Sequence, residues 1–268
     1  MIRKLTDADS PQVLPFLKQS PSKTLFILGD IEIYGFETDF QELWGEFDEN
    51  NQIKAVLLRY YDGFTLYGFD YDAMALVQII QQHPHTIISG DQQILKPLLA
   101  HLNPENYQPR ETYFAEVTKT SLEKHTKDSS NVGRVKTGTV DDALRIATLE
   151  SSIEEFSNLK DPQKRAEQIR KKFESKAGRT YYIEEDEQIV SIASSTAENS
   201  LSAMIIGVAT SEGYRKRGYT SAILSKLLAD LLVDKESVCL FYDNPKAGNI
   251  YKRAGFQDIG MWTMIEKK

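Results

Sequence analysis

Cysteine is nearly absent from this sequence. Cys239 is the single cysteine among 268 residues, so the chain cannot form an intramolecular disulfide or a cysteine-rich zinc site. Cys239 lies within an alternating apolar segment, and cysteines in such segments usually behave as small core residues. We therefore expect it to pack in the core rather than to act as a nucleophile.

An excess of positive charge and a long apolar segment are also missing. The 39 acidic residues outnumber the 32 basic ones, which gives a net charge of −7 at pH 7. Nucleic-acid binding usually requires a basic surface, so we expect no nucleic-acid partner. No apolar run reaches the ~18–20 residues that span a bilayer, and residues 1–9 are too polar for a signal peptide. We expect a cytoplasmic protein that does not enter a membrane.

Histidine is confined to the first half of the chain, where the last one is His125. Chemistry in the second half must therefore work without imidazole, the most frequent general base. His83 and His85 could suggest a metal site, but no third histidine or acidic partner lies at ligand spacing. We interpret this pair as part of a surface loop and expect no metal.

The two halves of the sequence follow one pattern. Each begins with a short strand and an acidic helix start, at 2–9 and 135–142, and continues to two short strands around an acidic turn, at 44–58 and 181–193. Residues 123–133 are polar and lack apolar periodicity, which is typical of a linker. We therefore predict a tandem repeat of one α/β unit, with domains at 1–122 and 134–268.

A basic loop with a central glycine follows an apolar strand in the second half. Arg215, Lys216 and Arg217 supply positive charge, and Gly218 lets the backbone approach a ligand closely. A helix with an apolar stripe comes next, and the unpaired N–H groups at such a helix start favour phosphate binding. The alternative is an ordinary strand–turn–helix connection with basic residues on its surface. The chain lacks both the Walker and the dinucleotide-binding glycine patterns.

A second motif lies downstream, on a buried strand, a turn and a short helix at 238–256. It reads Asn244-x-x-Ala247-x-x-x-Tyr251-x-x-x-Gly255-Phe256, and the basic loop reads Arg215-x-x-Gly218-x-Thr220. In this order and on these elements, the two motifs resemble those of the GNAT superfamily of acetyl-CoA-dependent N-acetyltransferases. The resemblance covers 134–268 well and the first half weakly. It implies an α/β fold of tandem GNAT-like domains, each a twisted mixed sheet flanked by helices.

The basic loop departs from the family pattern at one position. Thr220 stands where the family has glycine or alanine. Its side chain adds bulk beside the expected pyrophosphate, although its hydroxyl could also donate a hydrogen bond there.

The resemblance also implies roles for individual residues. The expected contacts of acetyl-CoA are Val208, Ala209, Thr210, Arg215, Lys216, Arg217, Gly218, Tyr219, Thr220 and Asn244. The basic loop and the backbone amides at 217–220 would hold the pyrophosphate. The strand end at 208–210 would pair with the pantetheine arm and polarise the thioester carbonyl through a backbone N–H. Tyr251 occupies the family's general-acid position, from which it would protonate the departing thiolate.

A general base must deprotonate the acceptor ammonium. With no histidine in the second half, carboxylates remain, and a water chain could relay the proton. Glu198, in the turn before a central strand, is the first candidate, followed by Glu212, Glu154 and Glu155. The alternative for Glu198 is an exposed turn residue.

The first half lacks a counterpart of the basic loop. We expect the equivalent of 210–220 near 75–85, which contains no glycine, arginine or lysine. We therefore predict a degenerate repeat that packs on the second domain and helps to shape the acceptor cleft.

Together these features predict an N-acetyltransferase that moves the acetyl group of acetyl-CoA to a primary amine by direct attack, without a metal. The acidic net charge favours a cationic acceptor, either a small molecule or a lysine side chain. The alternatives are a noncatalytic acyl-CoA-binding or sensory module, and transfer of a longer acyl group. The sequence leaves open whether the protein forms a homodimer.

Overall fold

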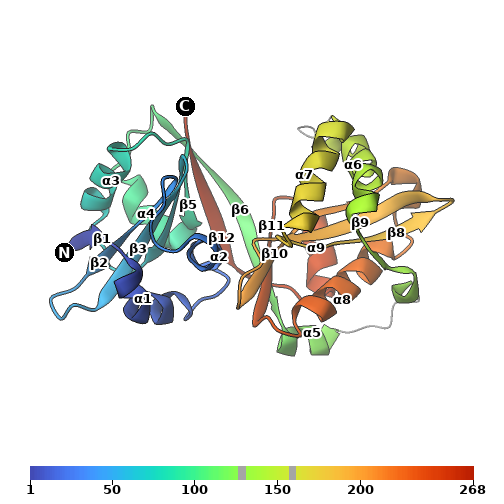
Figure 1. Ribbon diagram of the computed structural model, residues 1–268, viewed down its shortest axis with the longest axis horizontal. Coiled ribbons are helices and arrows are strands. Elements are labelled where there is room, and N and C mark those ends of the chain that lie inside the picture. Colours follow the sequence, from blue (N-terminus) through green and yellow to red (C-terminus); the bar gives the residue numbers. More distant parts are fainter. Residues whose placement is uncertain (126–130, 157–160) are drawn as a thin grey trace. The chain divides into compact units, whose positions relative to one another are not determined.

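The computed structural model describes residues 1–125, 131–156 and 161–268, so residues 126–130 of the expected linker lie outside the described part. The chain divides into two compact units. The first comprises Met1–Ala115, Phe241–Asp243 and Asp258–Lys268, and the second comprises Glu116–Leu240 and Asn244–Gln257. Each combines a sheet with helices, which confirms the predicted α/β class (Figure 1).

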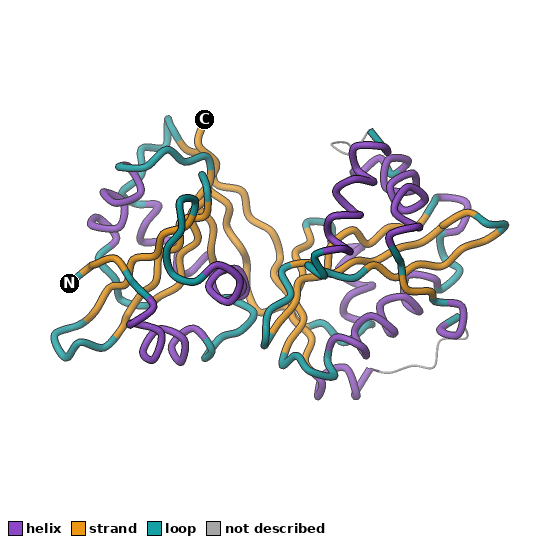
Figure 2. Tube along the Cα trace, viewed as in Figure 1, coloured by secondary structure: helices purple, strands orange, loops and turns teal. Residues whose placement is uncertain are grey.

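The two units repeat one order of elements. Apart from short 3₁₀ turns, each runs strand, two helices, three strands, helix, strand, helix, and Figure 2 shows this alternation along both parts of the chain. Both begin with the same capping box, Thr6 with Asp9 and Thr139 with Asp142. In this box the carboxylate accepts the backbone N–H of the threonine, which sets the turn into the helices. The tandem repeat predicted from the sequence is confirmed.

The sheet of the first unit has the strand order β1-β2-β3-β4-β5-β12-β6. Its strands are β1 (Ile2–Lys4), β2 (Gln41–Phe47), β3 (Ile53–Tyr60), β4 (Gly63–Gly68), β5 (Ile87–Asp91), β6 (Tyr107–Thr118) and β12 (Gln257–Lys267). Strands β1 to β4 are antiparallel neighbours, whereas β4 and β5 pair in parallel. The helices are α1 (Ser10–Leu17), α2 (Leu25–Tyr34), α3 (Ala73–Gln81) and α4 (Gln92–Leu99).

Strand β12 belongs to the first unit, although the expected domain at 134–268 includes it. It pairs antiparallel with β5, with Trp262 opposite Asp91. The Trp262 side chain is 2% exposed, and its ring centroid lies 5.3 Å from that of Phe114 and 6.0 Å from that of Phe26. Burial of these aromatic rings against each other accounts for the placement of β12 in this unit.

The sheet of the second unit has the order β11-β10-β9-β8-β7. Its strands are β7 (Lys136–Thr137), β8 (Thr180–Glu185), β9 (Gln188–Thr196), β10 (Ser202–Thr210) and β11 (Ser237–Tyr242). The helices are α5 (Lys119–His125), α6 (Ala143–Ser152), α7 (Pro162–Glu174), α8 (Tyr219–Leu231) and α9 (Pro245–Arg253). Helices α6 and α7 cover one face of this sheet, and α8 and α9 lie on the other (Figure 1).

Short polar sequences set several element boundaries in the second unit. Asp186 and Glu187 both have positive φ, at 47° and 64°, which suits the two-residue turn that joins β8 to β9. Asp161 caps α7 by accepting the backbone N–H of Gln163 at 3.0 Å, and Pro162 is the first helical residue. The turn agrees with the acidic turn expected between the two strands at 181–193.

The core of the second unit forms where α6 and α7 pack on the sheet. Ile146, Ile169 and Ile192 are at most 3% exposed in this cluster. Cys239 is fully buried, as expected. Among the helices that the structure describes, none is both long and apolar enough to cross a membrane.

Candidate active site

Strand β10 separates from β11 partway along its length, in the second unit's sheet. It pairs in parallel with β11 only from Ser202 to Met204, although it continues to Thr210. On its other side, the register with β9 shifts between Ile206 and Ala209. Gly207 lies in this bulge with φ at +62°. Because a bulge bends its strand, the end of β10 is turned away from β11, and the sheet opens there.

A buried ion pair lies beneath the bulge. Glu150 of α6 is 3% exposed, and its carboxylate accepts hydrogen bonds from Arg165 of α7, Nε at 2.5 Å and Nη2 at 3.2 Å. A Cβ placed on Gly207 would lie 3.6 Å from Oε1 of Glu150. The pair therefore joins the two helices directly under the point where the sheet opens.

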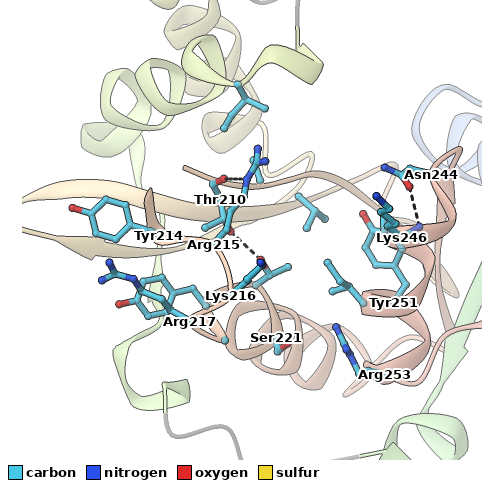
Figure 3. A pocket seen from close by; sticks show the side chains of 18 of the residues that line it. Thr210, Tyr214, Arg215, Lys216, Arg217, Ser221, Asn244, Lys246, Tyr251 and Arg253 are labelled. Atoms are coloured by element: carbon cyan, nitrogen blue, oxygen red, sulfur yellow. Dashed lines mark hydrogen bonds between the residues drawn. The ribbon is translucent and has the colours of Figure 1, made fainter. Parts of the chain in front are cut away.

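A pocket of about 820 Å³ occupies the opening, and Figure 3 shows its lining. The lining residues are Ile153, Phe156, Val208, Ala209, Thr210, Tyr214, Arg215, Lys216, Arg217, Gly218, Tyr219, Thr220, Ser221, Asn244, Lys246, Ala247, Ile250, Tyr251 and Arg253. Every residue predicted to contact acetyl-CoA is in this lining, and so is Tyr251. The structure thus gathers both sequence motifs around one pocket, while the roles of their residues stay predictions.

The charged residues of the described lining are all basic. Arg215, Lys216 and Arg217 lie on one side of the pocket, and Lys246 and Arg253 lie on the other (Figure 3). Clustered positive charge of this kind raises the local concentration of an anionic ligand. The pocket therefore has the opposite charge to the chain as a whole.

The basic loop has an unusual backbone that its own side chains support. Lys216 and Gly218 both have left-handed φ, at +66° and +80°, and Gly218 is the N-cap of α8. Nε of Arg215 donates to the Thr210 carbonyl at 3.2 Å. The Arg217 guanidinium lies 4.8 Å from the ring centroid of Tyr214 and donates to the Gly213 carbonyl at 3.1 Å. These contacts hold the loop around the open start of the helix.

The hydroxyl of Thr220 has a partner inside the protein. It lies 2.9 Å from the hydroxyl of Thr210, which lies 2.7 Å from that of Ser191. Ser191 in turn donates to the Ala209 carbonyl at 3.1 Å. Since each hydroxyl has one proton, Thr210 must donate to Ser191 and Thr220 to Thr210. The Thr220 proton is thus directed to the strand, not to a ligand as the sequence suggested.

Removal of this hydroxyl should cost stability. Thr220→Val keeps the shape of the side chain and deprives Thr210 of its donor, so we expect the free energy of unfolding to fall by about 1 kcal/mol. Thr148→Val is the control, because the exposed Thr148 hydroxyl bonds only within its own helix, to the Leu144 carbonyl; its effect should stay below about 0.5 kcal/mol. Urea denaturation of both variants measures the difference. Equal effects of the two substitutions would contradict a stabilising role for the hydrogen bond between Thr220 and Thr210.

Tyr251 is presented to the pocket by α9. Asn244 caps this helix by accepting the backbone N–H of Lys246 at 2.9 Å, and Pro245 is its first residue. The Tyr251 ring lies 6.0 Å from the Phe256 ring, at an interplanar angle of 71°. Burial raises the pKa of the Tyr251 phenol above its ordinary value. The phenol is therefore protonated at neutral pH, which is the state that a general acid requires.

The carboxylates considered as general bases do not line the pocket. Glu198 is 12% exposed, and its carboxylate accepts hydrogen bonds from Arg179 at 3.1 Å and from Ser195 at 2.5 Å. Glu154 and Glu212 are exposed and also lie outside the lining. The side chain of Glu155 lies outside the described residues. In the part of the chain that is described, no group of three or more His, Cys, Asp and Glu residues could hold a metal ion.

Several lining residues were not found from the sequence. Ile250 lies on the same face of α9 as Ala247 and Tyr251 of the second motif, so the helical period of that motif could have indicated it. Ile153 and Phe156 come from the connection between α6 and α7. The sequence indicated only the carboxylates Glu154 and Glu155 of this connection, because its apolar residues reach the pocket only through the fold.

The first unit has no such site at the corresponding position. By element order, the counterpart of the basic loop is 69–72 before α3, and not 75–85 as expected, because residues 73–81 are the helix itself. This loop contains Asp70 and Asp72. The Asp72 carboxylate caps α3 by accepting the backbone N–H of Ala75 at 3.0 Å. A carboxylate at the helix start repels phosphate, in agreement with a degenerate repeat.

Comparisons with known proteins agree with this architecture. A family model described as GNAT acetyltransferase matches residues 29–265, whereas no curated protein matches the chain significantly. A Drosophila protein of known structure aligns over 100% of this chain and 98% of its own, with a TM-score of 0.68 and 9% identity. A tandem GNAT protein from the clavulanic acid biosynthesis pathway aligns over 100% and 98%, with a TM-score of 0.57 and 10% identity.

A third solved structure, a GCN5-related N-acetyltransferase from Sphaerobacter thermophilus, aligns over 100% of this chain and 95% of its own, with a TM-score of 0.59 and 15% identity. At these identities the structural similarity shows the fold. Together with the family model, it places the chain among acyltransferases in general. The chain belongs to the GNAT acetyltransferase family, as the two sequence motifs indicated.

Proposed function

We propose that this protein transfers the acetyl group of acetyl-CoA to a primary amine. The observation that carries the proposal is a single pocket in which three features meet. These are the basic loop at the start of α8, the end of β10 that is unpaired on its β11 side, and the phenol of Tyr251. An anion site, a source of backbone N–H groups and a protonated acid are what thioester aminolysis needs.

The basic side of the pocket fits the anionic end of CoA. Arg215, Lys216 and Arg217 carry the positive charge, and the first N–H groups of α8 have no partner within the helix. Helix starts of this kind bind phosphate through backbone N–H groups and the helix dipole. In the proposal, these groups hold the pyrophosphate, and Asn244 and the end of β10 contact the pantetheine arm.

The chemical step uses the opposite end of the pocket. The acceptor nitrogen attacks the acetyl carbonyl carbon, and a backbone N–H from 208–210 stabilises the oxygen that becomes negative. The carbon–sulfur bond then breaks, and the thiolate takes the proton of the Tyr251 hydroxyl. The proposal assigns no side chain as general base, since the described lining contains neither a carboxylate nor a histidine. The acceptor ammonium loses one proton to solvent before it attacks, and the second proton, released as the amide forms, restores the Tyr251 hydroxyl.

Two measurements test the proposal. Isothermal calorimetry with acetyl-CoA measures binding, and release of free thiol in the presence of amines measures transfer. The amine panel should include a diamine, a neutral primary amine and a lysine peptide. Binding followed by thiol release with any of them supports the proposal. Binding without release across the panel would favour a noncatalytic acyl-CoA module, and no binding would overturn both readings.

A further inference from the structure

Asn131 contacts the basic loop from outside its sequence motif. It precedes the short 3₁₀ helix Val132–Arg134 as the N-cap residue, but its side chain makes no hydrogen bond to that helix. Instead, its Nδ2 donates to the carbonyl oxygen of Arg217 at 3.0 Å. An asparagine at an N-cap normally accepts an N–H from its own helix. Here the Asn131 side chain is instead hydrogen-bonded to the basic loop beside the pocket.

This hydrogen bond fixes the orientation of one peptide plane. The described chain has no cis peptide bond, so the Arg217 carbonyl and the Gly218 N–H point in opposite directions. Gly218 lines the pocket, whereas Asn131 does not. A carbonyl directed toward Asn131 therefore leaves the Gly218 N–H directed away from Asn131, toward the pocket.

The local sequence does not fix the orientation of the Arg217–Gly218 peptide plane. Rotation of the plane changes ψ of Arg217 and φ of Gly218, and glycine accepts both signs of φ at little cost. Gly218 has φ at +80°, and a Cβ added to it would lie 3.5 Å from Nδ2 of Asn131. The local sequence thus permits both orientations of the plane, and the contact with Asn131 favours one.

Arg134 holds the segment that carries Asn131. Its Nη1 donates to the Tyr219 hydroxyl at 3.3 Å, its Nη2 lies 2.8 Å from the Glu185 carboxylate, and its guanidinium lies 5.3 Å from the Tyr219 ring centroid. Tyr219 is the first residue of α8, directly after Gly218. The segment 131–134 is therefore attached at two points to the start of the helix that forms the anion site.

We infer that Asn131 is a positioning residue for the pyrophosphate of acetyl-CoA: it holds the Arg217 carbonyl out of the pocket, so that the Gly218 N–H faces the ligand. This inference rests on the proposed function. It assigns a role in cofactor recognition to a residue just before the second repeat, which neither motif includes.

The test compares acetyl-CoA with pantetheine, which lacks the acetyl group and the whole nucleotide part of CoA, the pyrophosphate included. Asn131→Ala should raise the Kd of acetyl-CoA about fivefold to tenfold, the effect of one hydrogen bond, and leave the Kd of pantetheine, which has no phosphate, unchanged. Calorimetry measures the first and NMR titration the second. Asn103→Ala is the matched control, because Asn103 bonds within its own turn, to the N–H of Glu105; neither Kd should change.

Two results would overturn the inference. One is an unchanged Kd of acetyl-CoA in Asn131→Ala, and the other is an equal loss for both ligands, which would indicate a general effect on the fold. If the unsubstituted protein does not bind acetyl-CoA, the proposed function fails, but the peptide orientation is still testable. The HN–Hα couplings of Gly218 report its φ, which should change in Asn131→Ala. Unchanged couplings would contradict the role given to Asn131.

Discussion

Tyr251→Phe should lower the rate of acetyl transfer at least about 100-fold, the usual contribution of a general acid. Phenylalanine keeps the ring that packs 6.0 Å from Phe256, and it removes only the hydroxyl. The leaving thiolate would then depart without a proton donor from the protein. The Kd of acetyl-CoA should stay nearly constant, since the anion site lies on other elements. Single-turnover rates and calorimetry separate the two quantities.

Tyr113→Phe is the matched control for this substitution. Tyr113 lies in β6 of the first unit, where its ring stacks on Tyr242 at 4.8 Å, and it does not line the pocket. Loss of its hydroxyl should leave both the rate and the Kd unchanged. A Tyr251→Phe protein with full activity would exclude Tyr251 as the acid, and one that also lost acetyl-CoA would indicate a binding role.

The Tyr251 hydroxyl also predicts how the transfer rate depends on pH. Burial raises the pKa of Tyr251 above the ordinary tyrosine value of 10.0. The acid works only while protonated, so the transfer rate should persist through neutral and mildly alkaline pH and fall as the pH rises through this elevated pKa. The decline should be absent in Tyr251→Phe. A radiolabelled acetyl group is the suitable readout, with circular dichroism to verify that the protein stays folded. The same alkaline decline in both proteins would refute the assignment.

Gly218→Val should weaken acetyl-CoA binding about 5- to 30-fold. Gly218 has φ at +80°, and a β-branched residue in this region is a genuine outlier. The left-handed conformation costs ordinary residues roughly 1–2 kcal/mol, so the loop should move to negative φ and turn its N–H groups. Each 1.4 kcal/mol of lost binding energy is about a factor of ten in Kd. Calorimetry with acetyl-CoA measures the loss.

Gly213→Val introduces the same side chain a few residues earlier. Gly213 has no positive φ, and a Cβ there would meet no atom within 4 Å. The Kd of acetyl-CoA for Gly213→Val should remain within about twofold of that for the unsubstituted protein, because surface substitutions in open space rarely change the free energy of unfolding by more than about 0.5 kcal/mol. Equal losses at the two positions would show that bulk in the loop matters, and not the backbone conformation of Gly218.

Local sequence patterns predicted much of this molecule. The hairpin turn at Asp186 and the basic loop before α8 both depend on residues a few positions apart. Such interactions are local, so they can be recognised without the fold. The two motifs together indicated the family and named residues that the structure gathers around one pocket.

Features that depend on distant segments could not be predicted in this way. Glu198 is in the turn expected from the sequence, but its partner Arg179 follows α7, and nothing near Glu198 indicates that pairing. The contact between Asn131 and Arg217 joins residues 86 positions apart. The bulge at Gly207 could be suspected from a glycine within a strand, whereas the opening of the sheet beside it depends on where β11 lies.

The placement of β12 has a consequence for the order in which the chain folds during synthesis. The first unit's sheet has β12 between β5 and β6, yet residues 116–240 are made before that strand. During synthesis, the first unit therefore has two unpaired strand edges, on β5 and β6, until the residues of the second unit and then β12 have been made. Exposed edges are sites of aggregation, so slow synthesis of residues 116–240 should harm the first unit more than the second. Expression of 1–122 alone should yield insoluble protein that a peptide of residues 257–268 rescues in trans.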